Sequence, residues 1–236
     1  MQILRRGGEY LEAREYWQWT ALAIVVLVAT VALAFGLRSS EGLTPEGILM
    51  PLGPVMLGLL VGRRPLRRIV ARIRAVRKGR LGERLVTDLL TRLPGHYYLV
   101  NDVVLGAGNI DHVVTGPCGI VVIETKRVAG RIRCDGDTWT VNGRRSKSYS
   151  RQIKAGAVAI KTFLAARHPE LKGTFVRAIV VFTDPLCHLD VNRAEVAVAR
   201  FSELLPLMNE LGRVRQLDDR LARAVAHSLA GTAANA

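Results

Sequence analysis

The stretch that decides the fold is residues 110–126, which read IDHVVTGPCGIVVIETK. It contains two β-branched runs, at 113–115 and 120–123, and such residues favour strands. The tetrapeptide between the runs, Gly116-Pro117-Cys118-Gly119, is typical of a tight turn. The stretch therefore predicts a β-hairpin with two antiparallel strands.

A turn centred on Pro117 and Cys118 fixes the register of this hairpin, and the same register places Asp111 opposite Glu124. Opposed side chains share a face, with Cβ atoms about 4.5–5.5 Å apart. Lys126 lies two residues further on and therefore on the face of Glu124. Because two opposed carboxylates repel each other, a hard cation such as Mg²⁺ or Mn²⁺ would stabilise the pair. We expect a metal-dependent phosphodiesterase site here.

The alternative is an exposed hairpin end with solvated charges. A turn that is one residue longer or shorter would also rotate Asp111 to the other face. However, the second strand is apolar at four successive positions, 120–123, as is typical of a strand buried on both faces. Polar residues at the end of such a strand are expected in a cleft rather than on an open surface.

The N-terminal quarter of the chain has the composition of a membrane segment. Residues 16–37 include no charged side chain, and 22 uncharged, predominantly apolar residues are enough for a helix to span a bilayer. A second uncharged run, 47–62, has 16 residues and two prolines. We therefore predict two transmembrane helices within residues 16–62. The alternatives are one span followed by an interfacial or re-entrant segment, and, with less support, a cleaved signal peptide.

The basic residues that flank the two uncharged runs predict the orientation of the helices in the membrane. Residues 63–80 hold nine bases and no acid, whereas the connection between the two apolar runs holds one base, Arg38. The positive-inside rule then places residues 63–80, and with them the rest of the chain, in the cytoplasm. Residues 1–15 carry three arginines and are expected on the same side. The sequence thus predicts a multi-pass protein of the cytoplasmic membrane with both termini in the cytoplasm.

The net charge of +14 is unevenly distributed, since residues 63–80 contribute +9 of it. Residues 63–78 are expected to form a basic amphipathic helix on anionic lipid. Residues 126–154 contain nine bases and two acids, which favours a phosphate-backbone partner. A solvated basic surface is the alternative. The candidate phosphate contacts are Arg144, Arg145, Lys147, Arg151 and Lys154.

The three cysteines, Cys118, Cys134 and Cys187, do not have the paired spacing of a zinc site. An odd, scattered set in a cytoplasmic domain is expected to consist of reduced thiols.

The rest of the soluble part is expected to be mixed α/β. A stripe of Leu81, Leu85, Leu89 and Leu93 predicts a helix over 79–93. Further strands are expected at 97–105, 175–183 and 195–199, a second hairpin at 130–141 around Asp135-Gly136, and helices at 148–166, 201–211 and 217–229.

This order of elements, with its residues, resembles the NERD (nuclease-related) domain of the PD-(D/E)XK nuclease-like superfamily. The resemblance is carried by Gly79-Arg80-Leu81-Gly82-Glu83, Leu89 to Pro94, Asn101-Asp102-Val103, Asn109 to Val114, Gly119 to Lys126, Gly130-Arg131-Ile132, Trp139 and Gln152. It implies a restriction-endonuclease-like core of a helix, a three-strand meander, a helix and a strand. That core would cover residues 79–185. Residues 186–230 would pack on it as an extension, and residues 231–236 would be a disordered tail.

The resemblance also implies roles for single residues. Asp111 and Glu124 would be the metal carboxylates, with the backbone carbonyl of Thr125 as an additional ligand. Lys126 would orient or activate the attacking water, Glu83 would be an auxiliary acid, and Gln152 would approach from the following helix.

Two functions are compatible with the sequence. The first is a membrane-anchored, divalent-metal-dependent nuclease at the cytoplasmic face, with DNA as the expected substrate. The second is a catalytically inactive membrane-anchored module that binds nucleic acid or a protein partner through the same fold.

Overall fold

The computed structural model describes residues 1–5, 70–71, 73–106 and 108–233. The chain divides into two compact units, 1–8 with 79–236, and 9–78. The predicted transmembrane helices at 16–62 lie outside the described residues, as do nearly all of the segments that flank them. Among the helices that the structure does describe, none has the length and apolarity needed to cross a membrane.

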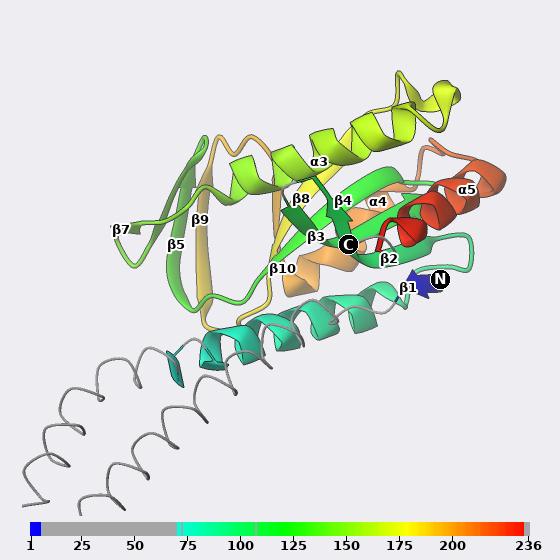
Figure 1. Cartoon of the computed structure of the whole chain (residues 1–236). Coiled ribbons are helices and arrows are strands. Elements are labelled where there is room, and N and C mark those ends of the chain that lie inside the picture. Colours follow the sequence, from blue (N-terminus) through cyan, green and yellow to red (C-terminus); the bar gives the residue numbers. More distant parts are fainter. Residues whose placement is uncertain (6–69, 72, 107, 234–236) are drawn as a thin grey trace, which may run out of the picture. The chain divides into compact units, whose positions relative to one another are not determined.

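The first unit is built on a six-stranded sheet (Figure 1). Its strands, in spatial order, are β1 (Gln2–Arg5), β2 (Tyr98–Leu105), β3 (Gly108–Gly116), β4 (Gly119–Lys126), β8 (Val176–Phe182) and β10 (Ala197–Arg200). The strands β2, β3 and β4 form an antiparallel meander, whereas β1 pairs in parallel with β2, β8 with β4, and β10 with β8. The predicted three-strand meander is therefore present, extended by three strands in parallel pairs.

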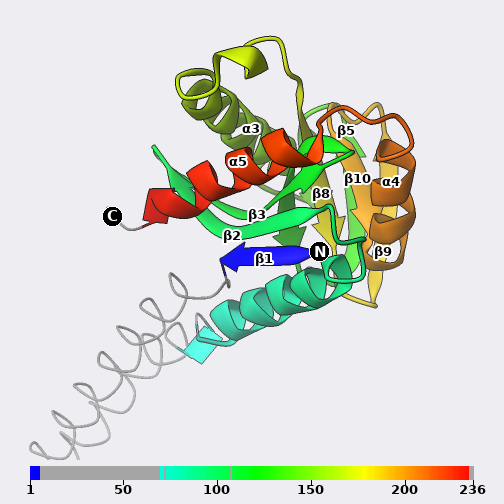
Figure 2. The same cartoon turned by 90° about the vertical axis from the view of Figure 1, so that its right-hand side faces the viewer.

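Helices cover both faces of this sheet, as Figure 2 shows. On one face, α3 (Tyr149–Ala165) and α5 (Asp219–Ala230) enclose one buried apolar cluster with the sheet. On the other, α4 (Leu204–Leu211) and residues 79–90 of the N-terminal helix enclose a second. Each fully buried aliphatic side chain in these clusters contributes about 1.5–3 kcal/mol to folding, so the sheet is a rigid base for residues at its strand ends.

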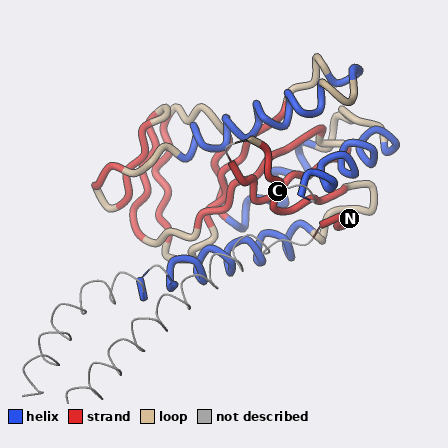
Figure 3. The backbone as a smooth tube through the Cα atoms, viewed as in Figure 1, coloured by secondary structure: helices blue, strands red, loops and turns tan. Residues whose placement is uncertain are grey.

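A second sheet lies at one end of the first (Figure 3). It consists of β7 (Arg144–Arg145), β6 (Thr138–Val141), β5 (Gly130–Asp135) and β9 (Cys187–Asn192). Trp139 of β6 attaches it to α3, because the indole is buried and its Nε1 donates to Ser150 Oγ at 2.8 Å. The Tyr149 ring lies 5.0 Å from that of Trp139. The helix α3 starts at this anchor, where the Ser148 hydroxyl caps the N–H of Arg151.

Most of the predicted elements are confirmed. The turn of the first hairpin lies at Pro117 and Cys118, and the second hairpin turns after Asp135. The elements predicted at 97–105, 148–166, 175–183, 195–199, 201–211 and 217–229 correspond to β2, α3, β8, β10, α4 and α5, with a short 3-10 turn, η2 (Phe201–Glu203), before α4. A second such turn, η1 (Pro169–Leu171), follows α3.

Some predictions are wrong in detail. The helices predicted at 63–78 and 79–93 are one continuous helix over residues 73–90, with no break at 79 and an end three residues earlier than predicted. Its buried stripe is Val86, Leu89 and Leu90, whereas Leu81 is 47% exposed. The strands β1, β7 and β9 are not predicted by the sequence pattern. The tail does not begin at Gly231, since Gly231–Ala233 form the 3-10 turn η3; residues 234–236 lie outside the described part.

Candidate active site

The β3–β4 hairpin has the register that the turn predicts. Thr115 pairs with Ile120 and Val113 with Val122. The ladder ends at the pair of His112 and Ile123, one step before Asp111 and Glu124. There the Thr125 N–H donates to Asp111 Oδ2 at 2.7 Å instead of to the β3 backbone. Both acids therefore lie just beyond the end of the ladder, and Asp111 is bound to the β4 backbone.

Glu124, Lys126 and Gln152 form a closed network beside Asp111. Lys126 makes an ion pair with Glu124 Oε1, and Gln152 Nε2 donates to the same oxygen at 2.7 Å. The Lys126 ammonium also donates to Gln152 Oε1 at 3.2 Å and lies 5.3 Å from the centre of the Tyr149 ring. Since Glu124 is only 4% exposed, these contacts replace its lost hydration. The structure thus brings Gln152 of α3 to the end of β4, as the resemblance implies.

Negative charge accumulates around this network. Burial, together with the charges of Asp102 and Glu124, raises the pKa of Glu83 to about 7, while the charges of Arg80 and Lys126 oppose the shift. Burial also raises the pKa of Asp111 well above its usual range, with added repulsion from Glu124 and Glu83. The hydrogen bond from Thr125 and the charge of Lys126 oppose that shift. Glu83 is thus influenced by Asp102 and Glu124, and Asp111 by Glu124 and Glu83, so we call these four residues, Glu83, Asp102, Asp111 and Glu124, the acid cluster.

His112 has a structural role on the opposite face of the sheet, as alternation along β3 predicts. Its Nδ1 lies 2.7 Å from Asn101 Oδ1 and its Nε2 lies 3.2 Å from Thr125 Oγ1. Burial lowers the pKa of this imidazole to about 3. His112 is therefore neutral at physiological pH and fixes the side chain of Thr125.

The acid cluster has the donor chemistry for a hard divalent cation. Carboxylates and a backbone carbonyl are the oxygen ligands that Mg²⁺ and Mn²⁺ prefer, and mutual repulsion among the acids favours any cation that neutralises them. The Thr125 carbonyl lies on the Asp111 side of β4, because the N–H and C=O of one residue point to the same side of a strand. Within the described residues, no three His, Cys, Asp or Glu side chains are close enough to hold a metal together. A cation held by Asp111 and Glu124 would therefore take its remaining ligands from this carbonyl and from water.

The basic candidates separate into two groups. Arg144 and Arg145 on β7 and Lys147 after it are exposed, and none of the three has an ion-pair partner within the described part of the chain. Lys154, in contrast, binds Asp137 Oδ2 at 2.9 Å and also Glu195, while Arg151 lies 3.4 Å from the same Asp137 oxygen. The first group is therefore available for phosphates, whereas Lys154 is already engaged by carboxylates.

Two residues near the site were not predicted to be site residues, although one of them, Asp102, contributes to the family resemblance. Asp102 is 1% exposed and lies in a strand whose other residues, apart from Asn101, are hydrophobic, and an acid inside such a run is a recognisable signal. Tyr149, which places its ring near Lys126, has no comparable signal, because an aromatic residue at the start of a helix usually belongs to the core.

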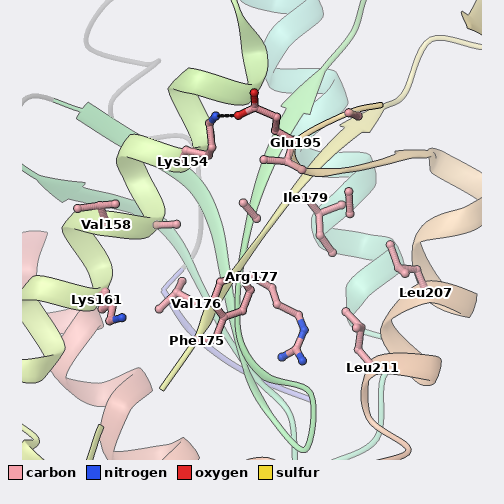
Figure 4. Close-up of a pocket in the computed structure, with 15 residues that line it drawn as sticks. Lys154, Val158, Lys161, Phe175, Val176, Arg177, Ile179, Glu195, Leu207 and Leu211 are labelled. Atoms are coloured by element: carbon pink, nitrogen blue, oxygen red, sulfur yellow. Dashed lines mark hydrogen bonds and ion pairs between the residues drawn. The ribbon is translucent and has the colours of Figure 1, made fainter. Parts of the chain in front are cut away.

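A pocket lies apart from the acid cluster. It has a volume of about 850 Å³ and is lined mainly by apolar residues of α3, β8, α4 and the segment before β10, among them Val158, Val176, Ile179 and Leu207 (Figure 4). None of the four acids lines it. The acid cluster and this pocket are therefore separate features of the molecule.

Comparison with known families gives a match over the part of the chain that contains the site. The family model described as the nuclease-related domain, NERD, matches residues 78–183. Comparison with curated proteins and with solved structures gave no match. The matched range contains the whole acid cluster, Lys126, Gln152 and the strands that position them, with mixed α/β architecture consistent with a nuclease-like core. Residues 78–183 are thus similar to the nuclease-related domain.

Proposed function

We propose that this protein is a membrane-anchored, divalent-metal-dependent nuclease that hydrolyses phosphodiester bonds at the cytoplasmic face of the membrane. The observation that carries the proposal is the network of Glu124, Lys126 and Gln152 next to Asp111. This network lies within the range that matches the nuclease-related domain, at the end of β4. It brings together the carboxylates and the lysine that metal-dependent phosphodiester hydrolysis would use.

Each residue has a role that its position supports. Asp111, Glu124 and the Thr125 carbonyl would hold Mg²⁺ or Mn²⁺. The bound cation would lower the pKa of a water and stabilise charge on the phosphate. Lys126 orients the attacking water and stabilises the negative charge that develops on the phosphoryl oxygens. Gln152 fixes the positions of Lys126 and Glu124 through its two hydrogen bonds.

Glu83 is suited to proton transfer. A carboxyl whose pKa is about 7 is populated in both protonation states at neutral pH. It can accept a proton as water attacks phosphorus, or return one to the leaving oxygen as the P–O bond breaks. We assign Glu83 this auxiliary acid–base role.

The substrate is proposed to be DNA, held through its phosphates. The β6–β7 hairpin presents Arg144 and Arg145, followed by Lys147, all exposed and without ion-pair partners in the described residues. Such contacts position a nucleic-acid backbone without reading its sequence. The uncharged runs 16–37 and 47–62 supply the proposed membrane anchor, which would restrict the nuclease to substrates near the membrane.

One observation favours a second function, a catalytically inactive module that binds nucleic acid or a protein partner. Glu124 already has two good partners, Lys126 and Gln152, and a satisfied network stabilises a fold without any catalysis. The two functions differ in whether phosphodiester bonds are broken.

The test is a cleavage assay on the full chain in detergent micelles, with labelled DNA and RNA and with Mg²⁺, Mn²⁺ or chelator. Glu124→Gln and Lys126→Ala should each abolish metal-dependent cleavage, while Lys161→Ala, an exposed lysine of α3, should not. Cleavage that survives both site substitutions would remove the proposed site. Metal-independent binding without cleavage would establish the second function instead.

A further inference from the structure

Asp102 has an unusual backbone conformation in the middle of β2. Its φ is 51°, in the left-handed region. Of the described non-glycine residues, only Asn142 and Arg193 also have a positive φ, and both lie outside the strands. Asp102, in contrast, is flanked by residues that pair with β3 on both sides. Aspartate tolerates this conformation better than most residues because its short polar side chain can bond locally.

The conformation reverses the faces of β2. In a regular strand, residues three apart point to opposite faces. Val100 and Val103 nevertheless both lie in the cluster beneath α3 and α5. The reversal therefore takes place at Asp102.

The partner strand is reversed at the same level. Val113 and Ile110 of β3 also lie in that one cluster. The pairs on either side, Asn101 with His112 and Val103 with Ile110, keep one register, so neither strand has an extra residue. Asp102 and Asp111 are thus the two residues that face each other inside a paired kink.

The kink determines which group the Asp111 carboxylate binds. Because β3 departs from β4 after the pair of His112 and Ile123, the Thr125 N–H is left without a backbone acceptor on β3. The Asp111 carboxylate takes that position at 2.7 Å. The orientation of a proposed metal carboxylate therefore depends on where the strands kink.

The Asp102 side chain lies inside the same assembly. It is 1% exposed, and Asn109 Nδ2 lies 3.4 Å from its Oδ1. Its charge is also one of those that raise the pKa of Glu83, which places the carboxylate near the other acids.

We infer that Asp102 is a positioning residue: its left-handed backbone produces the paired kink that directs the Asp111 carboxylate onto the Thr125 N–H. This inference concerns the geometry on which the proposed nuclease function rests, but it requires neither metal nor substrate to be tested.

The test uses substitutions that differ in their tolerance of a positive φ. Asp102→Gly adopts that conformation without strain, Asp102→Asn tolerates it and keeps the side-chain shape, and Asp102→Val is strongly disfavoured there. The readout is the hydrogen-exchange protection of the Thr125 amide, in the full chain labelled with ¹⁵N-threonine. Thr115, which is paired with Ile120 and Tyr98 in the regular part of the sheet, is the internal control.

Asp102→Gly and Asp102→Asn should keep Thr125 protection within about threefold, whereas Asp102→Val should lower it about tenfold, as expected for one lost hydrogen bond. Thr115 should be unchanged in all three. If Thr115 also loses protection in the valine variant, Asp102→Ala, which is less strained, takes its place. Unchanged Thr125 protection in the strained variant, or equal loss in the glycine variant, would overturn the inference. Because no cleavage is measured, an absence of nuclease activity would not be mistaken for its failure.

Discussion

Gln152 donates a hydrogen bond to Glu124 across 2.7 Å and so connects α3 to the end of β4. The amide oxygen of the same side chain accepts from Lys126 at 3.2 Å. A neutral side chain that donates to the carboxylate and accepts from the ammonium fixes both charges without adding one. The packing of α3 against the end of β4 therefore determines the positions of Glu124 and Lys126.

The first prediction concerns Gln152. Replacing it by alanine removes both hydrogen bonds, and residues that orient a site in this way typically contribute about 10–100-fold. We expect Gln152→Ala to lower the cleavage rate by about that factor and to lower the free energy of unfolding by about 1–2 kcal/mol. Single-turnover kinetics and urea unfolding measure the two effects. Lys161→Ala on the same helix is the control, and a wild-type rate for Gln152→Ala would contradict the assigned role.

The second prediction is a pH dependence due to Glu83. Its pKa in the folded protein is about 7, above the ordinary value of 4.5, so between these values the folded state binds more protons than the unfolded state. The stability contribution of this group is therefore largest below pH 4.5 and is lost as the pH rises through 7. Relative to Glu83→Gln, the wild type should lose stability between pH 5 and pH 8 without divalent cation, and Mg²⁺ should reduce the loss. A pH-independent difference between the two proteins would contradict the shift.

The hairpin of β3 and β4 could be predicted from sequence because its determinants are local. The Gly116–Gly119 turn sets the register, and β-branched residues set the strands, so Glu124 and Lys126 fall on one face by counting. The kink at Asp102 is not local in this sense. It requires two strands to reverse at the same level, and alternation counted along β3 alone places Asp111 directly opposite Glu124 rather than on the Thr125 N–H.

The missed strands have a similar explanation. The strand β1 precedes its partner β2 by more than 90 residues in the chain, and the Met1 amino group donates to the Leu93 carbonyl at 3.0 Å. No pattern within four residues indicates such a distant pairing. β9 alternates weakly and joins β5 in parallel. Its formation is decided by the neighbouring strand and not by its own propensity.

The third prediction separates the two groups of basic residues. The logarithm of the DNA-binding constant falls linearly with the logarithm of the salt concentration. Each lysine or arginine that is removed from a phosphate contact lowers the magnitude of this slope by about one. The combined variant of Arg144→Ala, Arg145→Ala and Lys147→Ala should therefore lower the slope for DNA by about two to three. Lys154→Ala should leave the slope unchanged, because this lysine binds Asp137 and Glu195. Fluorescence anisotropy over a range of KCl concentrations measures both, and a changed slope for Lys154→Ala with none for the triple variant would reverse the assignment.

The fourth prediction concerns Gly82, which precedes Glu83 on the N-terminal helix. A Cβ at this position would lie 2.9 Å from Thr183 Oγ1 and 3.2 Å from Thr125 Cγ2, so the helix contacts the ends of β4 and β8 only because the residue is glycine. We expect Gly82→Ala to destabilise the fold by about 1–3 kcal/mol through this overlap and to displace Glu83 from the acid cluster.

Thr183 provides the matched control for that substitution. Its Oγ1 is buried and has no hydrogen-bond partner in the described part of the chain, so Thr183→Ala should cost little on its own. In the double variant, removal of the hydroxyl relieves the closest contact, and the combined loss should be smaller than that of Gly82→Ala alone. Denaturant unfolding of the four proteins gives the coupling energy. If the two losses of unfolding free energy simply add, the methyl group that Gly82→Ala introduces does not meet Thr183 Oγ1 as closely as the 2.9 Å separation implies. Glu83 would then be held near Glu124 by contacts other than the close approach at Gly82.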